Sequence, residues 1–363
     1  MKVDARAEAW ARLQLSGVAP RPLVDLLRAF GNAEGVLAAT SAQRRRHVPA
    51  SVAARLDKGA DERRVATTLA WLREPAHGLV AWDDADYPSA LLEIGDPPPV
   101  FYCLGRRELL AAPAFAIVGS RNATPQGCAD AEAFAAALSA TGFTIVSGLA
   151  LGIDAAAHRG GLAQAGSSIA VVGTGLDRVY PARHRALAHD LAERGLLISE
   201  FALGTAALRQ NFPRRNRLVS GLARGVLVVE ATLSSGSLIT ARLAAEQGRE
   251  VFALPGSIHS PFSKGPHRLL REGAKLVETA QDILDELRIP ARAPFAAAVA
   301  GTRDETDTNA GAVVAALGHA PADVDALAAR TGLPAADVIA ALTALELDRR
   351  VAALPGGLWQ RLD

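Results

Sequence analysis

The sequence predicts an α/β fold: an extended Rossmann-like, doubly wound parallel sheet between a small N-terminal helical domain and a C-terminal winged-helix-like domain. Three observations predict it. Short apolar runs alternate with helical segments from residue 115 to residue 256, the first 75 residues have apolar side chains at helical spacing, and the last fifty follow a helix-then-hairpin pattern. A chain of 363 residues suits two or three domains.

The N-terminal domain is expected to span residues 1–75. The segment LQLSGVAPRPLVDLLRAFG (13–31) predicts a helix, a turn containing Gly17, and a second helix with one apolar face. This arrangement resembles a helix-hairpin-helix unit, which binds DNA phosphates through the amides of its turn. The alternative is a small helical bundle that packs on the main domain, and the sequence leaves both open.

The main domain is expected to span residues 76–288. Residues 79–110 are expected to form an irregular lead-in that contains Trp82, Tyr87-Pro88 and three consecutive prolines. Six apolar runs then predict strands: FAIVG (115–119), FTIVSG (143–148), SIAVVG (168–173), GLLISE (195–200), GVLVVE (225–230) and EVFALPG (250–256). Unbroken runs of this length are typical of strands buried on both faces, so they predict a parallel sheet covered by helices.

Residues 289–311 are expected to form a linker, and residues 312–363 a winged-helix-like domain. Three helical segments precede a two-stranded wing around Pro355-Gly356-Gly357. The expected recognition helix, AADVIAALTALELDRR, has basic residues only at its end, which weakens the case for reading a DNA groove. Binding of DNA and binding of a protein both remain open for this domain.

Composition excludes several classes of function. The net charge is +1, so DNA binding would need a local basic cluster rather than a bulk positive field. Cys103 and Cys128 form no CxxC pair, residues 1–20 lack a signal-peptide pattern, and no apolar stretch is long enough to span a membrane. We therefore expect a cytoplasmic protein without membrane contact.

Motifs of the common catalytic chemistries are also absent from the sequence. There is no GxxxxGK[ST] loop, no GxSxG elbow and no HExxH metal spacing, and the partial fingerprint Gly173-Thr-Gly175 has Arg178 at its third position. We expect no catalytic residues, no metal and no cofactor.

Glycine- and serine-rich loops follow four of the predicted strands. The carboxyl ends of parallel strands meet at one sheet edge, where helix N-termini direct amides and partial positive charge outward. The residues expected to bind anions there are Gly119, Ser120, Gly173, Gly175, Ser235 and Gly236. Asp154 is expected to cap the helix AAAHRGGL, with a catalytic acid as the alternative, and Glu200 and Glu230 are expected to be structural.

The densest signal is RQNFPRRNRLVSG (209–221), where arginines and asparagines surround Phe212. Guanidinium groups bind phosphate bidentately, and an aromatic ring offers a stacking surface to an unpaired base. Duplex DNA presents no free base face, so the pattern favours single strands. Arg121 is expected at the same sheet edge, and Arg183, His184 and Arg185 extend the basic track.

These motifs together resemble the DNA-processing protein A (DprA/Smf) family. The likeness rests on VGSRNATPQG, IVSGLALGIDAAAHRGGL, VVGTGLDRVYP, NFPRRNRLVSGLARGVLVVEATLSSGSLITARLAAEQGREVFALPG and KGPHRLLREGA, densely over residues 80–288. The resemblance implies a non-enzymatic protein of natural transformation that binds single-stranded DNA, protects incoming DNA, loads the RecA recombinase and dimerises through its Rossmann-like domain. The strand-binding residues that it implies are Arg121, Ser147, Gly148, Arg209, Phe212, Arg215 and Asn216.

Two departures from the family pattern and two alternative functions are noted. The position of Arg209 is often lysine in the family, and the asparagine of its YPxxN segment is His184 here. One alternative is an enzyme of the nucleotide phosphoribohydrolase type with Glu200 or Glu230 as its acid, but the PGGxGT loop of such enzymes is missing. The other is a sequence-specific regulator that acts through the winged helix.

Overall fold

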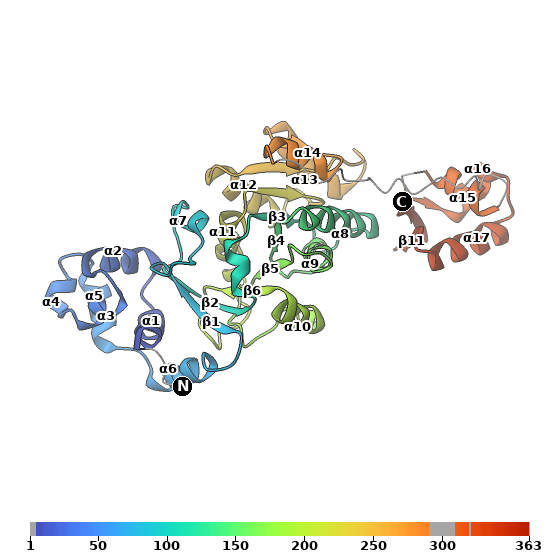
Figure 1. Cartoon of the computed structure of the whole chain (residues 1–363). Helices are drawn as coiled ribbons and strands as arrows, with labels where there is room; N and C mark the ends of the chain where they lie inside the picture. Colours follow the sequence, from blue (N-terminus) through green and yellow to red (C-terminus); the bar gives the residue numbers. More distant parts are fainter. Residues whose placement is uncertain (1–4, 290–308, 319–320, 363) are drawn as a thin grey trace.

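The computed structural model describes residues 5–289, 309–318 and 321–362 (Figure 1). Its N-terminal part is helical, as predicted, and contains α1 (Ala5–Leu15), α2 (Pro20–Phe30), α3 (Ala33–Ala38), α4 (Ser41–Arg44), α5 (Ala50–Lys58) and α6 (Glu62–Trp71). Gly17 makes the turn between α1 and α2 at a φ of +71°, which favours glycine.

The contacts of these helices match the bundle that packs on the main domain. Trp10 and Leu26 are fully buried in the same apolar cluster as Tyr102 and Leu197 of the large sheet. The helix-hairpin-helix alternative finds weaker support, because α2 begins Pro-Arg-Pro, and Pro20 and Pro22 have no N–H to offer a phosphate.

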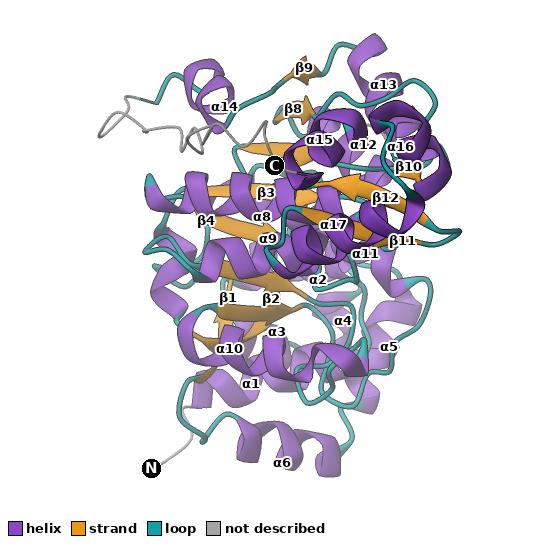
Figure 2. Ribbon diagram, turned by 90° about the vertical axis from the view of Figure 1, so that its right-hand side faces the viewer, coloured by secondary structure: helices purple, strands orange, loops and turns teal. Residues whose placement is uncertain are grey.

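The main domain contains a nine-stranded sheet with helices on both faces (Figure 2). Its strands are β1 (His77–Ala81), β2 (Val100–Gly105), β3 (Ala114–Val118), β4 (Thr144–Ser147), β5 (Ser168–Val171), β6 (Leu196–Ser199), β7 (Gly225–Val228), β8 (Glu250–Ala253) and β9 (Lys275–Leu276). Their order is β1-β2-β6-β5-β4-β3-β7-β8-β9. All six predicted strands are present, and β3 to β8 pair in parallel as expected.

The lead-in is more regular than predicted. β1 and β2 pair antiparallel with each other, and β2 pairs antiparallel with β6, so residues 77–105 extend the sheet. The short helices α7 (Ser89–Leu92) and η1 (Arg107–Ala111) accompany them. The prolines at 97–99 lie in the connection between the strands, where they interrupt no ladder.

The remaining helices of this domain connect the strands. They are α8 (Pro125–Ala140), α9 (Ile153–Leu162), η2 (Ala182–His184), α10 (Arg185–Arg194), α11 (Asn211–Leu222), α12 (Ser237–Glu246), η3 (Pro261–Ser263), α13 (Lys264–Arg271) and α14 (Ala280–Glu286). α8, α9, α10 and α14 cover one face of the sheet, and α7, α11, α12 and α13 cover the other.

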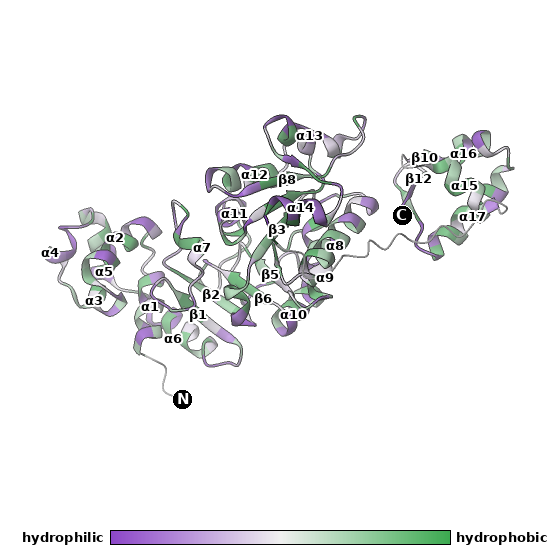
Figure 3. Ribbon diagram, turned by 45° about the horizontal axis from the view of Figure 1, so that its top comes forward, coloured by the Kyte–Doolittle hydropathy of each residue, from purple (hydrophilic) through white to green (hydrophobic). Residues whose placement is uncertain are grey.

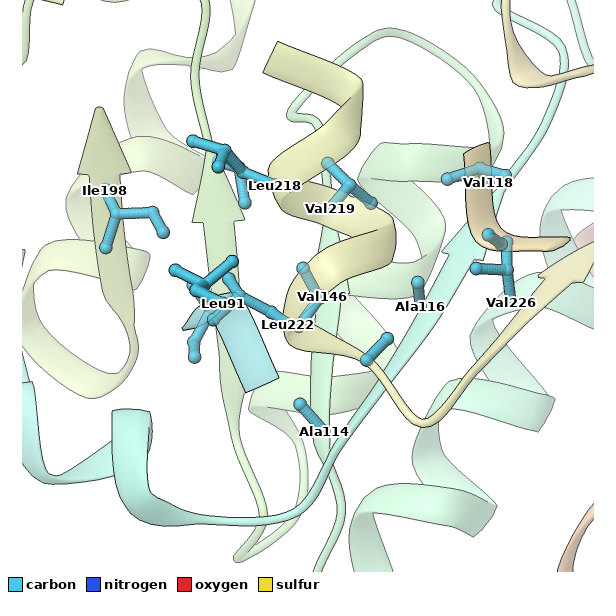
Figure 4. Packing of buried hydrophobic residues seen from close by; sticks show 14 of the residues in the cluster. Leu91, Ala114, Ala116, Val118, Val146, Ile198, Leu218, Val219, Leu222 and Val226 are labelled. Atoms are coloured by element: carbon cyan, nitrogen blue, oxygen red, sulfur yellow. The ribbon is translucent and has the colours of Figure 1, made fainter. Parts of the chain in front are cut away.

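Side chains of each parallel strand alternate between two apolar cores. In β3, Phe115 and Ile117 pack toward α8 and α9, whereas Ala116 and Val118 pack toward α11. β3, β5 and β6 accordingly take hydrophobic colours in Figure 3. Figure 4 shows Leu218 and Val219 of α11 packed over the strands, which fixes the rotation of this helix on the sheet.

The C-terminal domain has the predicted winged-helix pattern. It comprises α15 (Asn309–Leu317), β10 (Ala322–Asp323), α16 (Val324–Thr331), α17 (Ala335–Leu347), β11 (Val351–Leu354) and β12 (Leu358–Arg361). β11 and β12 form the wing, and β10 pairs with β12. Most of the expected linker lies outside the described residues, and α15 begins inside its C-terminal end. In the described ranges, no helix is long and apolar enough to cross a membrane.

Candidate functional site

A cavity of about 770 Å³ lies at the carboxyl ends of the parallel strands. β3 is the first parallel strand along the chain; β4, β5 and β6 continue the sheet on one side of it, and β7, β8 and β9 on the other. The loops after β3 and β7 therefore separate at this point, and such a switch in strand order is where open α/β sheets bind ligands. Both loops and the first turns of α11 line the cavity.

Arg121 lies exposed in the loop after β3, and this loop is fixed at both ends. The Ser120 hydroxyl accepts a hydrogen bond from the Asn122 amide at 3.1 Å. The Glu230 carboxylate, just after β7, accepts hydrogen bonds from the amide and hydroxyl of Thr124 at 2.8 and 2.6 Å. Glu230 therefore has the structural role expected for it, and Arg121 extends from an ordered backbone into the cavity.

The basic segment 209–221 is divided by helix geometry. Besides Pro213, the cavity-lining residues of α11 lie on one face of the helix, at three- or four-residue spacing starting from Phe212: Arg215, Asn216 and Val219. Arg214 and Arg217 instead form ion pairs with the buried Glu200, at 3.2 and 2.6 Å. The four arginines thus do not form one basic surface; Arg209, ahead of the helix, and Arg215 are the two that line the cavity.

Phe212 is half-buried and has three close neighbours. The guanidinium carbon of Arg121 lies 5.6 Å from its ring centroid, within cation–π range. The Tyr180 ring lies 5.6 Å away, centroid to centroid. Gly173 packs beneath, since a Cβ there would lie 3.1 Å from Phe212 Cδ1. A side chain at this position would force the ring to shift by a few tenths of an ångström.

Arg215 lies in the floor of the cavity rather than at its rim. Its side chain is buried, donates a hydrogen bond to the Val171 carbonyl, and lies against Gly148, where any Cβ would overlap the guanidinium. Burial lowers the pKa of Arg215 to about 10, and the nearby Asp154 carboxylate opposes that change. The group stays protonated at neutral pH, with little of its surface open to a ligand.

The prediction that Asp154 caps the helix is wrong. The N-cap of α9 is Gly152, and the Asp154 carboxylate instead accepts hydrogen bonds from the amides of Gly148 and Ala150, at 3.1 and 3.2 Å. Burial raises the pKa of Asp154, and the charge of Arg215 opposes the change. A carboxylate bonded in this way holds the loop after β4, and Asp154 also lines the cavity.

His158 completes the support of this loop. Burial lowers its pKa to about 3, so the imidazole is neutral. Its Nε2 accepts a hydrogen bond from the Leu149 amide at 3.2 Å, which leaves Nδ1 to donate to the Ser168 hydroxyl at 2.7 Å. Leu149 has a φ of +58°, a left-handed conformation that is unfavourable for leucine. The buried histidine stabilises that strained backbone.

Contacts at the N-termini of the helices leave fewer of the predicted anion sites available. The N-terminus of α8 is capped by the Thr124 hydroxyl, which accepts from Gly127 N. At the N-terminus of α9, Asp154 introduces a negative charge. α12 begins after Gly236 without a side-chain cap, and its start lines the cavity together with Ser235. The amides of Ser237, Leu238 and Ile239 at this start already donate within the protein, to the Ser235 hydroxyl and to the Ser235 and Gly236 carbonyls, so this helix start offers a phosphate few free amides.

Four of the predicted contact residues do not line the cavity: Ser147, Gly173, Gly175 and Arg183. Ser147 is fully buried, and its hydroxyl donates to the Ile117 carbonyl, so the prediction that it contacts DNA is wrong. The Gly175 amide donates to the Thr205 carbonyl and is not available to an anion. Arg183 is exposed in η2 but does not line the cavity, so its role in an extended track stays a prediction.

The residues that line the cavity and that sequence reasoning missed include Asn122, Tyr180, Thr232 and Ser234. Tyr180 has a signal in the sequence, an aromatic residue before proline in the loop after the third parallel strand. The other three have no such signal, because loops contain many polar residues with no role in binding. The described residues also contain no group of three or more histidine, cysteine or acidic side chains arranged to hold a metal.

Comparisons with known proteins match this arrangement. The model of the family "DNA recombination-mediator protein A" matches residues 78–288, and that of the "DprA winged helix domain" matches residues 297–357. Protein Smf of Escherichia coli is 43% identical over 298 residues, covering 81% of this chain and 80% of that protein. A putative DNA processing protein DprA of Mycobacterium tuberculosis is 36% identical, covering 95% and 92%.

Two solved structures resemble the chain in fold as well as sequence. The X-ray structure of DNA processing protein A from Streptococcus pneumoniae has a TM-score of 0.69 and 38% identity, covering 79% of this chain and 99% of that one. DNA processing protein A from Helicobacter pylori, studied for its single-stranded DNA binding mode, has a TM-score of 0.53 and 32% identity, covering 58% and 95%.

Proposed function

The chain belongs to the DNA recombination-mediator protein A (DprA/Smf) family, and on that premise we propose that it binds single-stranded DNA in the cavity between the loops after β3 and β7. The observation that carries the proposal is the convergence of Arg121, Arg209 and Phe212 on one cavity at the switch in strand order. These residues come from separate loops and a helix.

Each part of the cavity complements one part of an unpaired nucleotide. Arg121 and Arg209 are exposed cations that pair with backbone phosphates. The Phe212 ring stacks on a base, which a duplex does not expose. Arg215 acts from the floor, where its buried charge attracts phosphate and the missing side chain of Gly148 leaves room for the guanidinium.

The two carboxylates that could act as the acid in the phosphoribohydrolase alternative are already paired with other groups of the protein. Glu200 is paired with Arg214 and Arg217, and Glu230 is bonded to Thr124. Neither carboxylate lines the cavity. A role as a binding protein accounts for these contacts, whereas hydrolysis would need one of the carboxylates to face the substrate.

Competition at fixed salt tests the proposal. A labelled oligothymidine bound to the full-length protein is challenged with unlabelled single strand or with duplex of equal length. We expect the single strand to displace the label at a concentration at least tenfold lower than the duplex. Equal displacement by both would show that phosphate contacts alone account for binding and would contradict the proposed base contact.

We further propose that the protein protects incoming DNA and loads the RecA recombinase during natural transformation in the cytoplasm, acting as a homodimer through its Rossmann-like domain. Two cavities in a dimer would hold a longer strand than one. Light scattering of the purified protein tests the dimer. RecA activity on single strands coated with single-strand-binding protein, measured with and without this protein, tests loading.

A further inference from the structure

Tyr180 is an exposed aromatic residue on the wall of the cavity, and none of the contacts proposed so far uses it. Its exposed fraction is 48%, whereas the other two tyrosines of the chain, Tyr87 and Tyr102, are buried. The Tyr87 hydroxyl donates to the Pro98 carbonyl, so that ring has a structural role. In the described part of the chain, the Tyr180 hydroxyl has no hydrogen-bond partner, and half of its ring is open.

The segment that carries Tyr180 is anchored on both sides. Before it, the Thr174 hydroxyl donates to the Arg178 carbonyl at 3.0 Å, and Asp177 accepts a hydrogen bond from the Gly204 amide at 2.8 Å. After it, Nδ1 of His184 lies 3.0 Å from the Leu149 carbonyl. Tyr180 is therefore held in position by the fold rather than being carried on an unsupported loop.

Tyr180 and Phe212 form one continuous aromatic surface. Their ring centroids are 5.6 Å apart and their planes are tilted by 40°. Aromatic rings at this separation are in direct contact, so no base fits between them. Bases can reach only the outward surfaces, and Arg121 lies over the Phe212 ring. The more open stacking surface in the unliganded protein is therefore that of Tyr180.

We propose that Tyr180 is a second base-stacking residue and forms, with Phe212, a two-ring platform for two neighbouring bases of a single strand. The first base stacks on Tyr180; a phosphate then draws the Arg121 guanidinium away from Phe212, and the next base takes its place. In this proposal the exposed Arg183, three residues after Tyr180, contacts a phosphate of the strand beyond the platform. This inference rests on the proposed function and adds a residue and an order of contacts to it.

Substitution of the ring tests the platform in the full-length protein. Tyr180→Ala should weaken binding of oligothymidine about tenfold, since one stacked base is worth roughly 1–3 kcal/mol. The slope of affinity against salt should not change, because a ring releases no counterions. Tyr180→Phe should rescue binding, because the ring and not the hydroxyl is used. Leu92→Ala, at an exposed apolar residue that does not line the cavity, is the matched control.

Photocrosslinking of the unmutated protein separates stacking from a packing role. With 5-iodouracil in the oligonucleotide, crosslinks should fall on two tryptic peptides, VYPAR with Tyr180 and QNFPR with Phe212. Crosslinks on QNFPR alone, together with unchanged affinity of Tyr180→Ala, would overturn the platform and leave the proposed function intact. If the unmutated protein binds no single strand at all, the proposed function itself fails.

Discussion

The cavity edge of the Rossmann-like domain and the exposed side of α17 in the winged-helix domain differ in the chemistry they offer to nucleic acid. The cavity brings together exposed cations and an aromatic pair. α17 contains no lysine or arginine and exposes Ile339 and Leu347, at 49% and 81%. A winged helix is a common reader of duplex grooves, but the side chains decide whether a given one binds DNA. This α17 is better suited to a protein surface.

The largest effect should come from reversing the charge at the tip of the β3 loop. Arg121→Glu is expected to weaken single-strand binding by roughly 100-fold or more, because a carboxylate would then face phosphate. A filter-binding titration measures it. Arg224→Glu is the matched control, since Arg224 is an exposed arginine just before β7, at the opposite edge of the sheet. Equal losses in both variants would mean that net charge, not the cavity, determines binding.

A second prediction concerns the buried polar groups that support the cavity. The folded-state pKa of His158, about 3, lies below its ordinary value of 6.5, so the unfolded chain takes up a proton first as the pH falls. This contribution to stability is complete above pH 6.5 and is lost progressively toward pH 3. Between pH 7 and pH 5 the free energy of unfolding should fall by about 2 kcal/mol through this group. Urea unfolding at the two pH values measures it.

His158→Gln provides the comparison, because a glutamine can accept from the Leu149 amide but does not titrate. The variant should lose less stability between pH 7 and pH 5 than the unmutated protein. In the described part of the C-terminal domain the one buried polar side chain is Gln360, so its unfolding should not share this pH dependence. A histidine variant with an undiminished pH response would show that another group is responsible.

Removing the ring of Phe212 should have a smaller effect that differs in kind. Phe212→Ala is expected to weaken binding about tenfold with an unchanged salt slope, because stacking involves no phosphate. Titrations at four salt concentrations give both quantities. Val219→Ala, farther along the same helix face, controls for loss of packing. A slope that falls together with the affinity would indicate that the substitution displaces Arg121.

The smallest effect should follow from removing the winged-helix domain. A chain ending at residue 289 should bind single strands within twofold of the full-length protein and should lose no affinity for duplex, since α17 offers phosphates no cation. Electrophoretic mobility shifts with both substrates measure this. Loss of duplex binding on truncation would show that the wing or Arg349 and Arg350 contact DNA, and it would remove the contrast between the two domains.

Much of the fold could be predicted because its signals are local. Each of the six apolar runs became a parallel strand, and the Pro-Gly-Gly turn became the wing. β1 and β2 were missed because β2 pairs with β6, about a hundred positions away, and β1 pairs with β2. In the candidate site, Arg121 and Phe212 met as expected, whereas Ser147 and Gly175 proved to be bonded within the protein.

The sequence by itself determined that cations and an aromatic ring would gather where the parallel strands end. The reason is that strand patterns and loop composition depend on residues that are neighbours in the chain. Only the tertiary structure decided which arginines face the cavity, because that depends on how α11 is rotated on the sheet. Packing of Leu218 and Val219 sets this rotation, places Arg215 in the floor and turns Arg217 toward Glu200. The same packing places Phe212 beside Tyr180, a contact between residues more than thirty positions apart.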